Sequence, residues 1–412
     1  MKIWIINHYA VPIKYYPLGR HTFFAQNLIA LGHEVKIFAA STVHNSDINL
    51  ISDDRPYIEE VHDGVLYVLI KCHGYSGNGI KRILNMWEFA WKLKGIIKNN
   101  FDKPDAIISC SMTMSACARG ISLAKDLGCP VVADITDLWP ETIVAYGAAT
   151  KHHPAVLMLR RLEKWIYKNA DAVVFSLEGA YDYIKEQHWD KDIPKSKIFY
   201  INNGVDIKSF DYNRDNYRIE DADLKDATIF KVVYTGSIRM VNRLGLLLDA
   251  AKLLKNNRVR FLIWGDGDEL DYLKCRVEKE HIDNVVFKGK VEKKFIPYIV
   301  SCADVNIAHY SASPILRFGI SLNKLFDYFA AGRPVVTDFC SKYDPVVINK
   351  AGVAAKDGSP EQIAEVINQI FEMSAEEKCK YANNSRQIGE KHDFSVLTRN
   401  MLNIIEDCLI DK

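Results

Sequence analysis

The sequence predicts an α/β protein built from two doubly wound, Rossmann-like domains that face a central cleft. Strand-like apolar runs alternate with amphipathic helical runs along almost the whole chain, which is typical of parallel strands joined by crossover helices. The chain has 412 residues, more than one hydrophobic core usually serves. Residues 207–228 are rich in Asp, Asn, Tyr and Lys and lack a clean apolar period. We therefore expect them to connect two domains.

The first expected domain, residues 1–206, opens with the apolar run KIWII and alternates strands with helices to its end. Its strands are short apolar runs, and Gly and Pro punctuate the loops between elements. Its helices carry apolar residues every three to four positions. The expected strands are 2–9 with its exit turn, 34–40, 65–71, 106–110, 130–135, 171–176 and 197–206, and the expected helices include 20–31, 80–99, 114–127 and 155–169.

The second expected domain, residues 207–389, repeats the alternation after the run FKVVYTGS. Ligands of open α/β sheets bind outside the carboxyl ends of the strands, so candidate chemistry should lie in strand-to-helix loops. A last helix, at about 394–409, has apolar residues at helical spacing and must pack on another element. The expected strands are 230–237, 260–264, 285–289, 305–310 and 335–338, and the expected helices are 244–256, 268–281, 293–302, 322–331 and 360–373.

Composition bounds the function. The net charge is +1, so there is no case for a nucleic-acid partner or a strongly acidic one. Nine cysteines, an odd number without a C-x-x-C pair, suit reduced thiols and give no zinc signature. The histidines show no metal spacing. We find no signal peptide and no apolar run long enough to cross a bilayer, so we expect a cytoplasmic protein.

The most informative stretch is RFGISLNKLFDYFAAGRP, residues 317–334. Gly319 lets a ligand approach the main chain closely. Ser321 suits the N-cap of a short helix over Leu322 to Ala331, and Gly332 suits its C′ position. The helix start is then open to an anion, because its free N–H groups and its dipole favour phosphate.

Two side chains of this helix indicate which ligand it could bind. Lys324 adds a positive charge in the first turn, and Asp327 lies three residues on, on the same face. A cation for a diphosphate and a carboxylate for ribose hydroxyls are what a nucleotide sugar requires. The alternative is a capped amphipathic helix whose Lys and Asp form an ordinary surface pair.

Six segments then point to a family. They are LIALGHEVKIFAA (28–40), DLWPE (137–141), NGVD (203–206), YTGSIRMVN (234–242), WGDGDE (264–269) and NKLFDYFAAGRPVV (323–336). In this order they resemble the retaining glycosyltransferases of family 4 with the GT-B fold. The resemblance covers nearly the whole chain and is greatest to the branch that makes bacterial capsule and O-antigen polysaccharides, which includes the L-fucosamine transferase.

The resemblance implies a nucleotide-sugar donor, UDP-linked in this branch, in the second domain and an acceptor mostly on the first. It implies a retaining reaction without a metal or other cofactor. It also implies that residues 390–412 cross back to the first domain, which would give the last helix its packing partner.

The donor site is expected to depart from the family pattern. The family commonly has two glutamates eight positions apart, where this chain has Gly319 and Asp327, and its usual Arg and Lys align with Ser237 and Asn242. We infer that Arg239 and Lys324 hold the diphosphate. Lys290 and Val291 are expected as backbone contacts to the base. The expected donor-binding residues are Gly19, Arg20, Ser237, Arg239, Gly265, Lys290, Val291, Gly319, Ile320, Ser321, Asn323, Lys324 and Asp327, and Asp137, Arg239 and Lys324 are expected to act in catalysis.

Two loops of the first domain carry the other candidates. Gly19 and Arg20 begin a helix after the first strand, where Arg20 could contact phosphate or be a solvated side chain at a helix start, and His21 is assigned to the acceptor. In DLWPE, Asp137 is placed to bind sugar hydroxyls, and Trp139 could form a flat wall against a sugar ring or be buried. Glu141 could orient an acceptor hydroxyl or merely cap the next helix.

Two further features concern partners. The expected helix 80–99 mixes five Lys and Arg residues with Trp87, Trp91 and aliphatic residues, which suggests contact with an anionic membrane surface. The alternative is an ordinary helix with its apolar face in the core. His309 ends a strand and could reach the donor, or it could be packed.

Together these features predict a transferase that moves a hexose or N-acetylhexosamine from a UDP-sugar to a lipid-linked or saccharide acceptor in surface polysaccharide synthesis. One rival is an enzyme resembling UDP-N-acetylglucosamine 2-epimerase, which would need acid and base groups at the sugar. Another is a non-catalytic subunit that binds nucleotide sugar, and Gly319 in place of a carboxylate is its best support.

Overall fold

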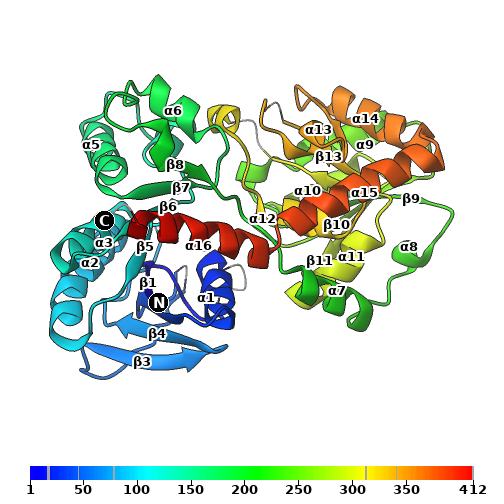
Figure 1. The fold of residues 1–412 in the computed structure, drawn as a ribbon. Coiled ribbons are helices and arrows are strands. Elements are labelled where there is room, and N and C mark those ends of the chain that lie inside the picture. Colours follow the sequence, from blue (N-terminus) through cyan, green and yellow to red (C-terminus); the bar gives the residue numbers. More distant parts are fainter. Residues whose placement is uncertain (16–18, 45, 78, 311–312, 340, 411–412) are drawn as a thin grey trace. The chain divides into compact units, whose positions relative to one another are not determined.

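The computed structural model describes residues 1–15, 19–44, 46–77, 79–310, 313–339 and 341–410 (Figure 1). The chain forms two compact units, Met1–Asn202 with Phe394–Lys412, and Asn203–Asp393. We describe each unit by itself. The expected boundary after residue 206 thus lies four residues beyond the observed one, and the return to the first unit begins at Phe394 rather than at residue 390.

The first unit contains an eight-stranded sheet with the order β3-β4-β2-β1-β5-β6-β7-β8. All neighbouring strands are parallel except β3, which pairs antiparallel with β4 at one edge. The strands are β1 Lys2–Ile6, β2 Glu34–Ala40, β3 Tyr57–His62, β4 Val65–Ile70, β5 Ala106–Cys110, β6 Val131–Ile135, β7 Ala172–Phe175 and β8 Ile198–Tyr200. Sequence analysis did not predict β3, and it extended β8 too far.

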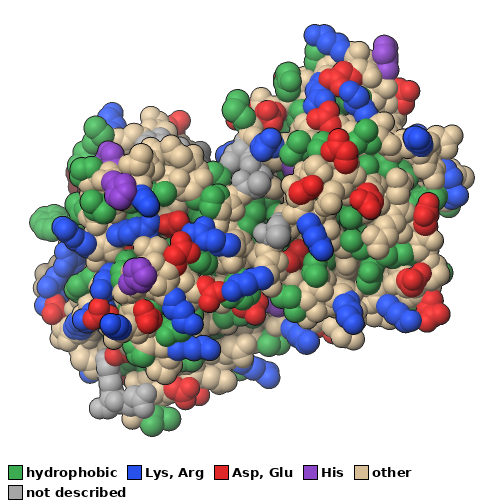
Figure 2. Space-filling model, turned by 90° about the horizontal axis from the view of Figure 1, so that it is seen from above, with side chains coloured by type: hydrophobic (Ala, Val, Ile, Leu, Met, Phe, Trp, Pro, Cys, Tyr) green, Lys and Arg blue, Asp and Glu red, His purple; other side chains and the backbone are tan. Residues whose placement is uncertain are grey.

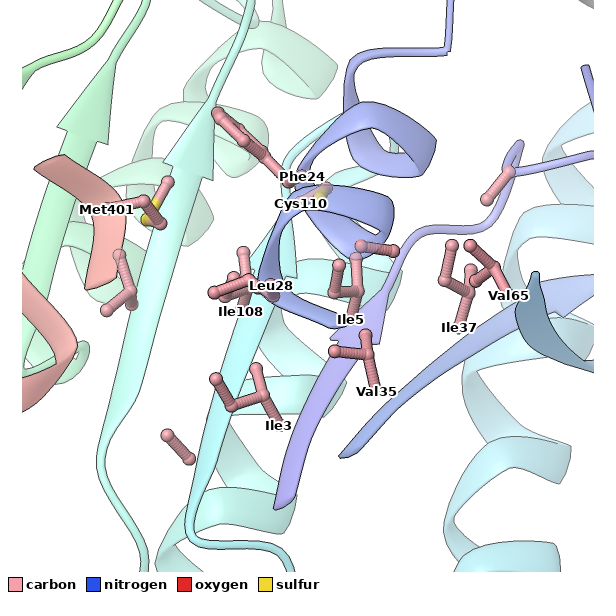
Figure 3. Close-up of a cluster of buried hydrophobic side chains, with 14 of the residues drawn as sticks. Ile3, Ile5, Phe24, Leu28, Val35, Ile37, Val65, Ile108, Cys110 and Met401 are labelled. Carbon is pink, nitrogen blue, oxygen red and sulfur yellow. The ribbon is translucent and has the colours of Figure 1, made fainter. Parts of the chain in front are cut away.

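Helices cover both faces of this sheet. The helices are α1 Arg20–Ala30, α2 Ile80–Asn100, α3 Met114–Leu127, α4 Glu141–Ala145, α5 Pro154–Asn169, α6 Ala180–Glu186 and the C-terminal α16 Phe394–Ile410. α1 packs against α16, whereas α2, α3 and α5 pack side by side. Strand β1 serves both layers. Ile3 and Ile5 join the core that also contains residues of α1 and α16 (Figure 3). The Trp4 ring, on the other face of the strand, packs on Phe101 after α2.

The second unit contains a six-stranded, all-parallel sheet with the order β11-β10-β9-β12-β13-β14. Its strands are β9 Phe230–Thr235, β10 Val259–Trp264, β11 Val285–Gly289, β12 Val305–Ala308, β13 Val335–Thr337 and β14 Gly352–Ala354. Its helices are α7 Ile207–Asn216, α8 Ala222–Lys225, α9 Gly245–Leu253, α10 Leu270–Lys279, α11 Ile296–Ser301, α12 Asn323–Ala330, α13 Pro345–Ile348, α14 Pro360–Glu372 and α15 Ala375–Lys391.

Residues 207–228 are not a bare connection, contrary to the prediction from their composition. They form α7 and α8, which belong to the second unit and bury Phe210 and Leu224 in its core. Their acidic side chains pair with basic residues of the same unit. Asp211 pairs with Arg386, and Asp223 pairs with both Arg260 and Lys288. The polar composition therefore reflects ion pairing within a folded unit.

Helix α15 was not predicted from the sequence, because its residues show little apolar periodicity. It packs closely on α12 through Gly389, where an added Cβ would lie 2.9 Å from the Ala330 nitrogen. A capping box at Ser374 and Glu377 fixes its start. The donor-helix candidate α12 is thus held from behind by a helix whose contact depends on a glycine.

Acidic and basic side chains are interspersed over the face of the molecule seen in Figure 2. This pattern agrees with the net charge of +1. The described residues contain no helix with both the length and the apolar character that crossing a bilayer requires. Nor do they contain a group of three or more His, Cys, Asp or Glu side chains placed to hold a metal ion.

Candidate functional site

The loops after β9 and β10 meet backbone to backbone at the carboxyl edge of the second sheet. Gly265 has φ +154°, and a Cβ there would lie 1.8 Å from the Gly236 carbonyl oxygen. Gly267 has φ +159°, and its Cβ would lie 2.1 Å from the Ile238 oxygen. Only glycine fits such positions. The Gly-x-Gly segment after β10 therefore shapes the loop that holds Gly236 and Ser237.

Lys324 reaches this loop from the first turn of α12. Its Nζ donates to the Tyr234 hydroxyl at 2.9 Å and lies 4.0 Å above the centre of that ring. A Cβ on Gly236 would come within 2.9 Å of the same Nζ. The Tyr234 hydroxyl in turn donates to the Ser237 carbonyl at 2.9 Å. The cation expected for the diphosphate thus lies against the loop expected to hold it.

The electrostatic setting of Lys324 is unusual. Although part of the side chain contacts solvent, the surrounding protein desolvates the ammonium group and lowers its pKa to about 7. The nearby Asp338 carboxylate opposes this effect. An ammonium held in a poorly solvated place with weak compensation is disposed to accept an anionic ligand.

The start of α12 differs from the prediction. The helix begins at Asn323, Leu322 occupies the N-cap position, and no side chain caps the first turn. Ser321 is therefore not the N-cap, and its Oγ is buried without a hydrogen-bond partner in the described part of the chain. Ile320 is buried just before it, and Gly332 ends the helix with φ +60°, as predicted. The main-chain N–H groups of the first turn consequently have no side-chain competitor for an anion.

Asp327 does not pair with Lys324. Its carboxylate instead forms an ion pair with Lys293, which follows β11. The surface-pair alternative from sequence analysis is therefore wrong, and Lys293 is a candidate that sequence reasoning missed. Its position three residues after Lys290, in the segment KGKVEKK, was the available signal. Lys290 itself is exposed, and Val291 is half-buried.

The remaining donor-side candidates are more open. The Arg239 side chain is exposed and makes no hydrogen bond or ion pair with any part of the chain that the structure describes. Ser237 is exposed, and its Oγ accepts a hydrogen bond from Asn242 at 2.8 Å. Gly319 has φ +120°, a conformation that other residues rarely adopt. It places main chain, with no carboxylate, before the donor helix.

Arg20 of the first unit is engaged in structural contacts. The buried guanidinium pairs with Asp134 of β6, with Nη2 3.0 Å from Oδ1, and donates to the carbonyl oxygens of Ile201 and Asn202. These bonds tie α1 to β6 and to the exit of β8. The geometry gives no support to the prediction that Arg20 contacts phosphate, because its donors already serve this network.

His21 lies in the next position on α1, after Gly19 at the N-cap. The ring is buried, with Nδ1 3.2 Å from the Asn7 amide nitrogen, and Nε2 has no partner in the ranges that the structure describes. Burial lowers the pKa of His21 to about 4. The ring is therefore neutral near pH 7. Its assignment to the acceptor stays a prediction.

The three candidates in DLWPE separate in the structure. Asp137 follows β6 and is exposed, and Trp139 is half-buried. Glu141 is buried and pairs with Arg160 of α5, which also donates to the Tyr183 hydroxyl at 3.0 Å. The prediction that Glu141 orients an acceptor hydroxyl is disfavoured, because its carboxylate joins α4 to α5. Of the three, Asp137 alone has an exposed polar side chain.

The amino-acid sequence matches two models of known protein families. Residues 22–209 match the family model described as Glycosyltransferase Family 4, and residues 217–388 match the model described as Glycosyl transferases group 1. The two models together cover most of the chain. Both halves of the chain therefore match glycosyltransferase models, and the chain has the GT-B fold.

Individual relatives agree with this class. The chain is 24% identical over 253 residues to "Probable glycosyltransferase WbjE" of Pseudomonas aeruginosa, and the match covers 60% of this chain and 61% of the relative. It is 25% identical over 208 residues to "Putative teichuronic acid biosynthesis glycosyltransferase TuaH" of Bacillus subtilis, and that match covers 50% of this chain and 49% of the relative. The matched region thus spans about half to three fifths of these relatives.

Solved structures show the same fold over the full chain. The structure of HepE from Anabaena in complex with UDP has a TM-score of 0.66 to this chain, with 14% identity, and covers 99% of this chain and 100% of that one. This structural likeness shows a shared fold, and at 14% identity it shows nothing about the ligand of this chain.

Proposed function

We propose that the protein transfers a hexose or N-acetylhexosamine, with retention of anomeric configuration, from a UDP-sugar to a lipid-linked or saccharide acceptor. The observation that carries the proposal is the placement of Lys324 against the Gly236–Ser237 loop, beside an uncapped helix start. Cation and free N–H groups at the carboxyl edge of a doubly wound sheet are what a diphosphate requires. HepE, which shares the fold, has been solved with UDP and with UDP-glucose.

In the proposed reaction the bond between the sugar anomeric carbon and the β-phosphate oxygen breaks. The bond from that carbon to the acceptor oxygen forms on the same face. The acceptor hydroxyl proton passes to the departing diphosphate oxygen, so no separate base is required. Lys324, the exposed Arg239 and the start of α12 stabilise the leaving negative charge. Asp327, held by Lys293, binds the ribose hydroxyls.

The proposed setting is surface polysaccharide synthesis, which is supported by the description of TuaH. The first test incubates the protein with a panel of UDP-sugars and a bacterial membrane lipid extract. Transfer of sugar to lipid or saccharide supports the proposal, whereas isomerisation of the UDP-sugar would support the epimerase alternative. Binding of UDP without either reaction would support a non-catalytic subunit. A chelator should leave transfer intact if the reaction needs no metal.

The ribose assignment has its own test. Asp327→Ala should weaken UDP binding at least tenfold, since a carboxylate that accepts two hydroxyl bonds is removed. Asp271→Ala is a matched control, because Asp271 lies exposed on α10 of the same unit and has no partner among the described residues. Unchanged UDP affinity in Asp327→Ala, measured by calorimetry, would remove Asp327 from the site.

We further propose that α2 contacts an anionic membrane surface. The helix has three distinct faces. Phe89, Leu93 and Ile97 are buried in the core. The exposed face holds a continuous apolar row at helical spacing, with exposed fractions of 75% for Ile80, 52% for Ile83, 60% for Leu84, 56% for Trp87 and 73% for Trp91.

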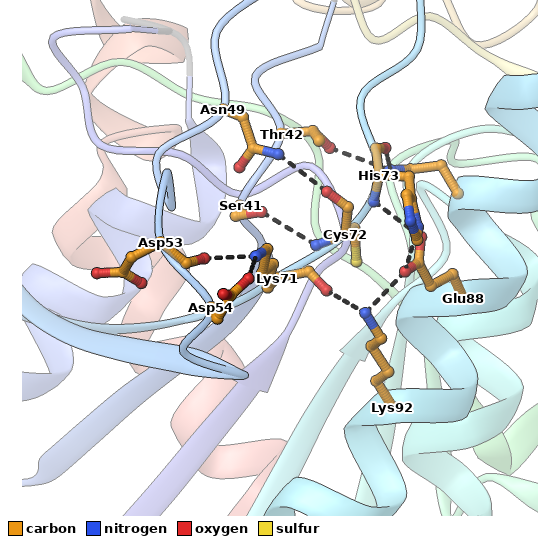
Figure 4. Close-up of polar contacts among 11 residues, drawn as sticks. Ser41, Thr42, Asn49, Asp53, Asp54, Lys71, Cys72, His73, Glu88 and Lys92 are labelled. Atoms are coloured by element: carbon orange, nitrogen blue, oxygen red, sulfur yellow. Dashed lines mark hydrogen bonds and ion pairs between the residues drawn. The ribbon is translucent and has the colours of Figure 1, made fainter.

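The third face of α2 is polar and holds the exit of β4 in place (Figure 4). The Asn85 amide donates to the His73 carbonyl at 2.7 Å, and Glu88 accepts from the His73 main-chain nitrogen at 2.9 Å. Lys92 donates to the Lys71 carbonyl at 2.7 Å. These bonds fix the rotation of α2 about its axis. The apolar row therefore stays exposed, because turning it inward would break this network.

An anionic lipid surface fits the charge of α2. The helix carries five basic residues and one acidic residue. Lys94 and Lys98 follow the row beyond Trp91, partly exposed and both paired with Asp126 of α3. Tryptophan and lysine together are typical of helices that lie in a lipid interface. A polar pocket of about 240 Å³ lies beside the first turn of α2 and suits the head of an amphipathic acceptor; it is lined by Thr42, Ser46, Asp47, Ile48, Gly74, Tyr75, Ser76 and Lys81.

Vesicle flotation tests this contact. The protein should float with vesicles that contain phosphatidylglycerol and much less with pure phosphatidylcholine. The double substitution Trp87→Ser and Trp91→Ser should reduce flotation at least tenfold and leave UDP binding unchanged. Tyr272→Ser is the control, since Tyr272 is 64% exposed on the second unit. Equal flotation of both variants would exclude α2 as the contact.

A further inference from the structure

A buried histidine and carboxylate lie side by side at the carboxyl edge of the second sheet, outside the residues assigned above. β12 and β13 are adjacent parallel strands with Ala308 opposite Thr337, so His309 and Asp338 are the next residues along each. His309 Nδ1 bonds Asp338 Oδ2, and both side chains are 1% exposed. Asp338 Oδ1 also accepts from the Tyr310 main-chain nitrogen at 3.0 Å.

This pair belongs to the surroundings of the donor helix. Asp338 is close enough to Lys324 and to Tyr234 for its charge to act on both groups. Lys324 and Tyr234 are the residues that hold the Gly236–Ser237 loop. The pair is therefore next to the groups proposed to take the diphosphate.

One ring nitrogen of this pair has no partner among the described residues. His309 Nε2 is buried and makes no hydrogen bond with them. A buried polar atom without a partner costs about 1–3 kcal/mol, and structures rarely keep one without a reason. A purely structural histidine could use both nitrogens, as a satisfied core residue does. The unpaired Nε2 leaves a position that an atom of a ligand could fill.

The carboxylate determines which kind of atom fits. A carboxylate can only accept, so His309 Nδ1 donates to Asp338, and the tautomer with its proton on Nδ1 leaves Nε2 as an acceptor. A phosphate oxygen has no proton to give and would approach the Asp338 charge. A sugar hydroxyl donates a proton and is neutral. The chemistry of the pair therefore favours a hydroxyl over a phosphate.

We propose that His309, oriented by Asp338, accepts a hydrogen bond from a hydroxyl of the transferred sugar in the nucleotide-sugar donor. This inference rests on the proposed function. It assigns the sugar a polar contact within the unit in which Gly319 offers no carboxylate. His309 would contact the substrate, and Asp338 would act as a positioning residue that fixes the ring and its proton.

The test compares binding of UDP with binding of UDP-glucose, UDP-galactose and UDP-N-acetylglucosamine by calorimetry. The wild-type protein should bind at least one of these UDP-sugars more tightly than it binds UDP. This gain in affinity is the sugar advantage. His309→Phe should remove about tenfold of that advantage and leave the affinity for UDP itself unchanged. His281→Asn is the control, because His281 is exposed in the same unit and Asn tolerates its φ of +52°.

A second variant covers the case in which His309→Phe fails to fold. Asp338→Asn keeps the volume and can turn the ring proton to Nε2, so the sugar advantage should fall while the melting temperature stays close to that of the wild type. Equal loss of UDP and UDP-sugar affinity would place the contact on the nucleotide and overturn the proposal. So would an unchanged sugar advantage, or a wild-type protein that binds UDP but gains nothing from any sugar. A protein that binds no UDP at all would instead overturn the proposed function.

Discussion

At the scale of single residues, the environment of a charge determines its behaviour more than its type. Lys324, Arg20 and Arg239 are all basic residues that sequence analysis assigned to phosphate. Lys324, on α12, lies against the Gly236–Ser237 loop with a pKa lowered to about 7 by desolvation, Arg20 is buried against Asp134, and Arg239 is exposed. Of the three, Lys324 has the charge state that a ligand can change.

This leads to a prediction about protons. A bound diphosphate favours the charged ammonium and should raise the pKa of Lys324 above about 7. Binding of UDP at pH 8 should therefore take up a proton, and binding at pH 6, where the group is already charged, should take up little. Asp338 and Tyr234 are the other titratable groups beside it. Calorimetry in two buffers with different heats of ionisation measures the uptake, and Lys324→Met should abolish it.

Two buried histidines of the first unit give a second prediction. Burial lowers the pKa of His8 to about 3 and that of His21 to about 4, whereas an unfolded histidine has a pKa near 6.5. Below pH 6.5 the unfolded state binds more protons, so stability is present above this pH and is lost as the pH falls toward 4. Each ring should contribute about 2 kcal/mol of this loss at pH 5.

Urea unfolding at pH 7 and pH 5 measures this loss. His21→Asn should remove about half of the pH dependence, because one of the two rings is gone. A variant that loses stability in parallel with the wild type would show that His21 does not titrate in this way.

At the scale of elements, close packing of loops rests on glycine. The turn after β10 fits under the turn after β9 only without a Cβ at Gly265, because that atom would lie 1.8 Å from the Gly236 oxygen. Gly289 also has a positive φ, of +79°, but a Cβ there would meet nothing within 4 Å. Comparing substitutions at the two positions separates two contributions to the free energy of unfolding. Gly289 reports the backbone conformation alone, whereas Gly265 also reports the steric clash of an added Cβ.

We expect Gly265→Ala to destabilise the second unit by more than 3 kcal/mol. It should also weaken UDP binding, because the Gly236–Ser237 loop must move to make room for the added Cβ. Gly289→Ala should cost about 1 kcal/mol, the usual penalty for a left-handed alanine. Thermal unfolding with and without UDP compares them. Similar losses in both variants would show that the loops do not pack as closely as described.

At the scale of the whole molecule, the first unit is completed by the end of the chain. α16 places Phe394, Leu397, Met401, Ile404 and Ile405 in the core of the first unit, all at most 7% exposed. The Phe23 and Phe394 rings stack with centroids 4.5 Å apart. Burial of five large apolar side chains contributes on the order of 10 kcal/mol, comparable to the whole stability of a domain.

Truncation after Asp393 should therefore unfold the first unit. The second unit of the truncated protein, residues 203–393, should remain folded. Met401→Ala is the milder change and should destabilise the first unit by about 2–5 kcal/mol, because Met401 is fully buried. Hydrogen exchange, read separately over the two units, measures both effects. Loss of protection in the second unit after truncation would contradict this division.

The sequence by itself determined the two α/β units, most strand positions, the glycine turn and the helix that carries Lys324 and Asp327. Local periodicity, capping residues and turn glycines are written in neighbouring residues, so they can be read without the fold. The same reading failed for residues 207–228 and for α15, because their polar side chains find partners far away in the chain.

Only the tertiary structure decided what each candidate side chain contacts. In the folded chain Asp327 pairs with Lys293, Glu141 pairs with Arg160, and Arg20 pairs with Asp134. The fold also places His309 beside Asp338, which is 29 residues further along the chain. Parallel strands bring the ends of distant segments to one edge of a sheet, and burial then sets which charges persist. Neither the pairing of such segments nor the burial of their ends is encoded in local sequence.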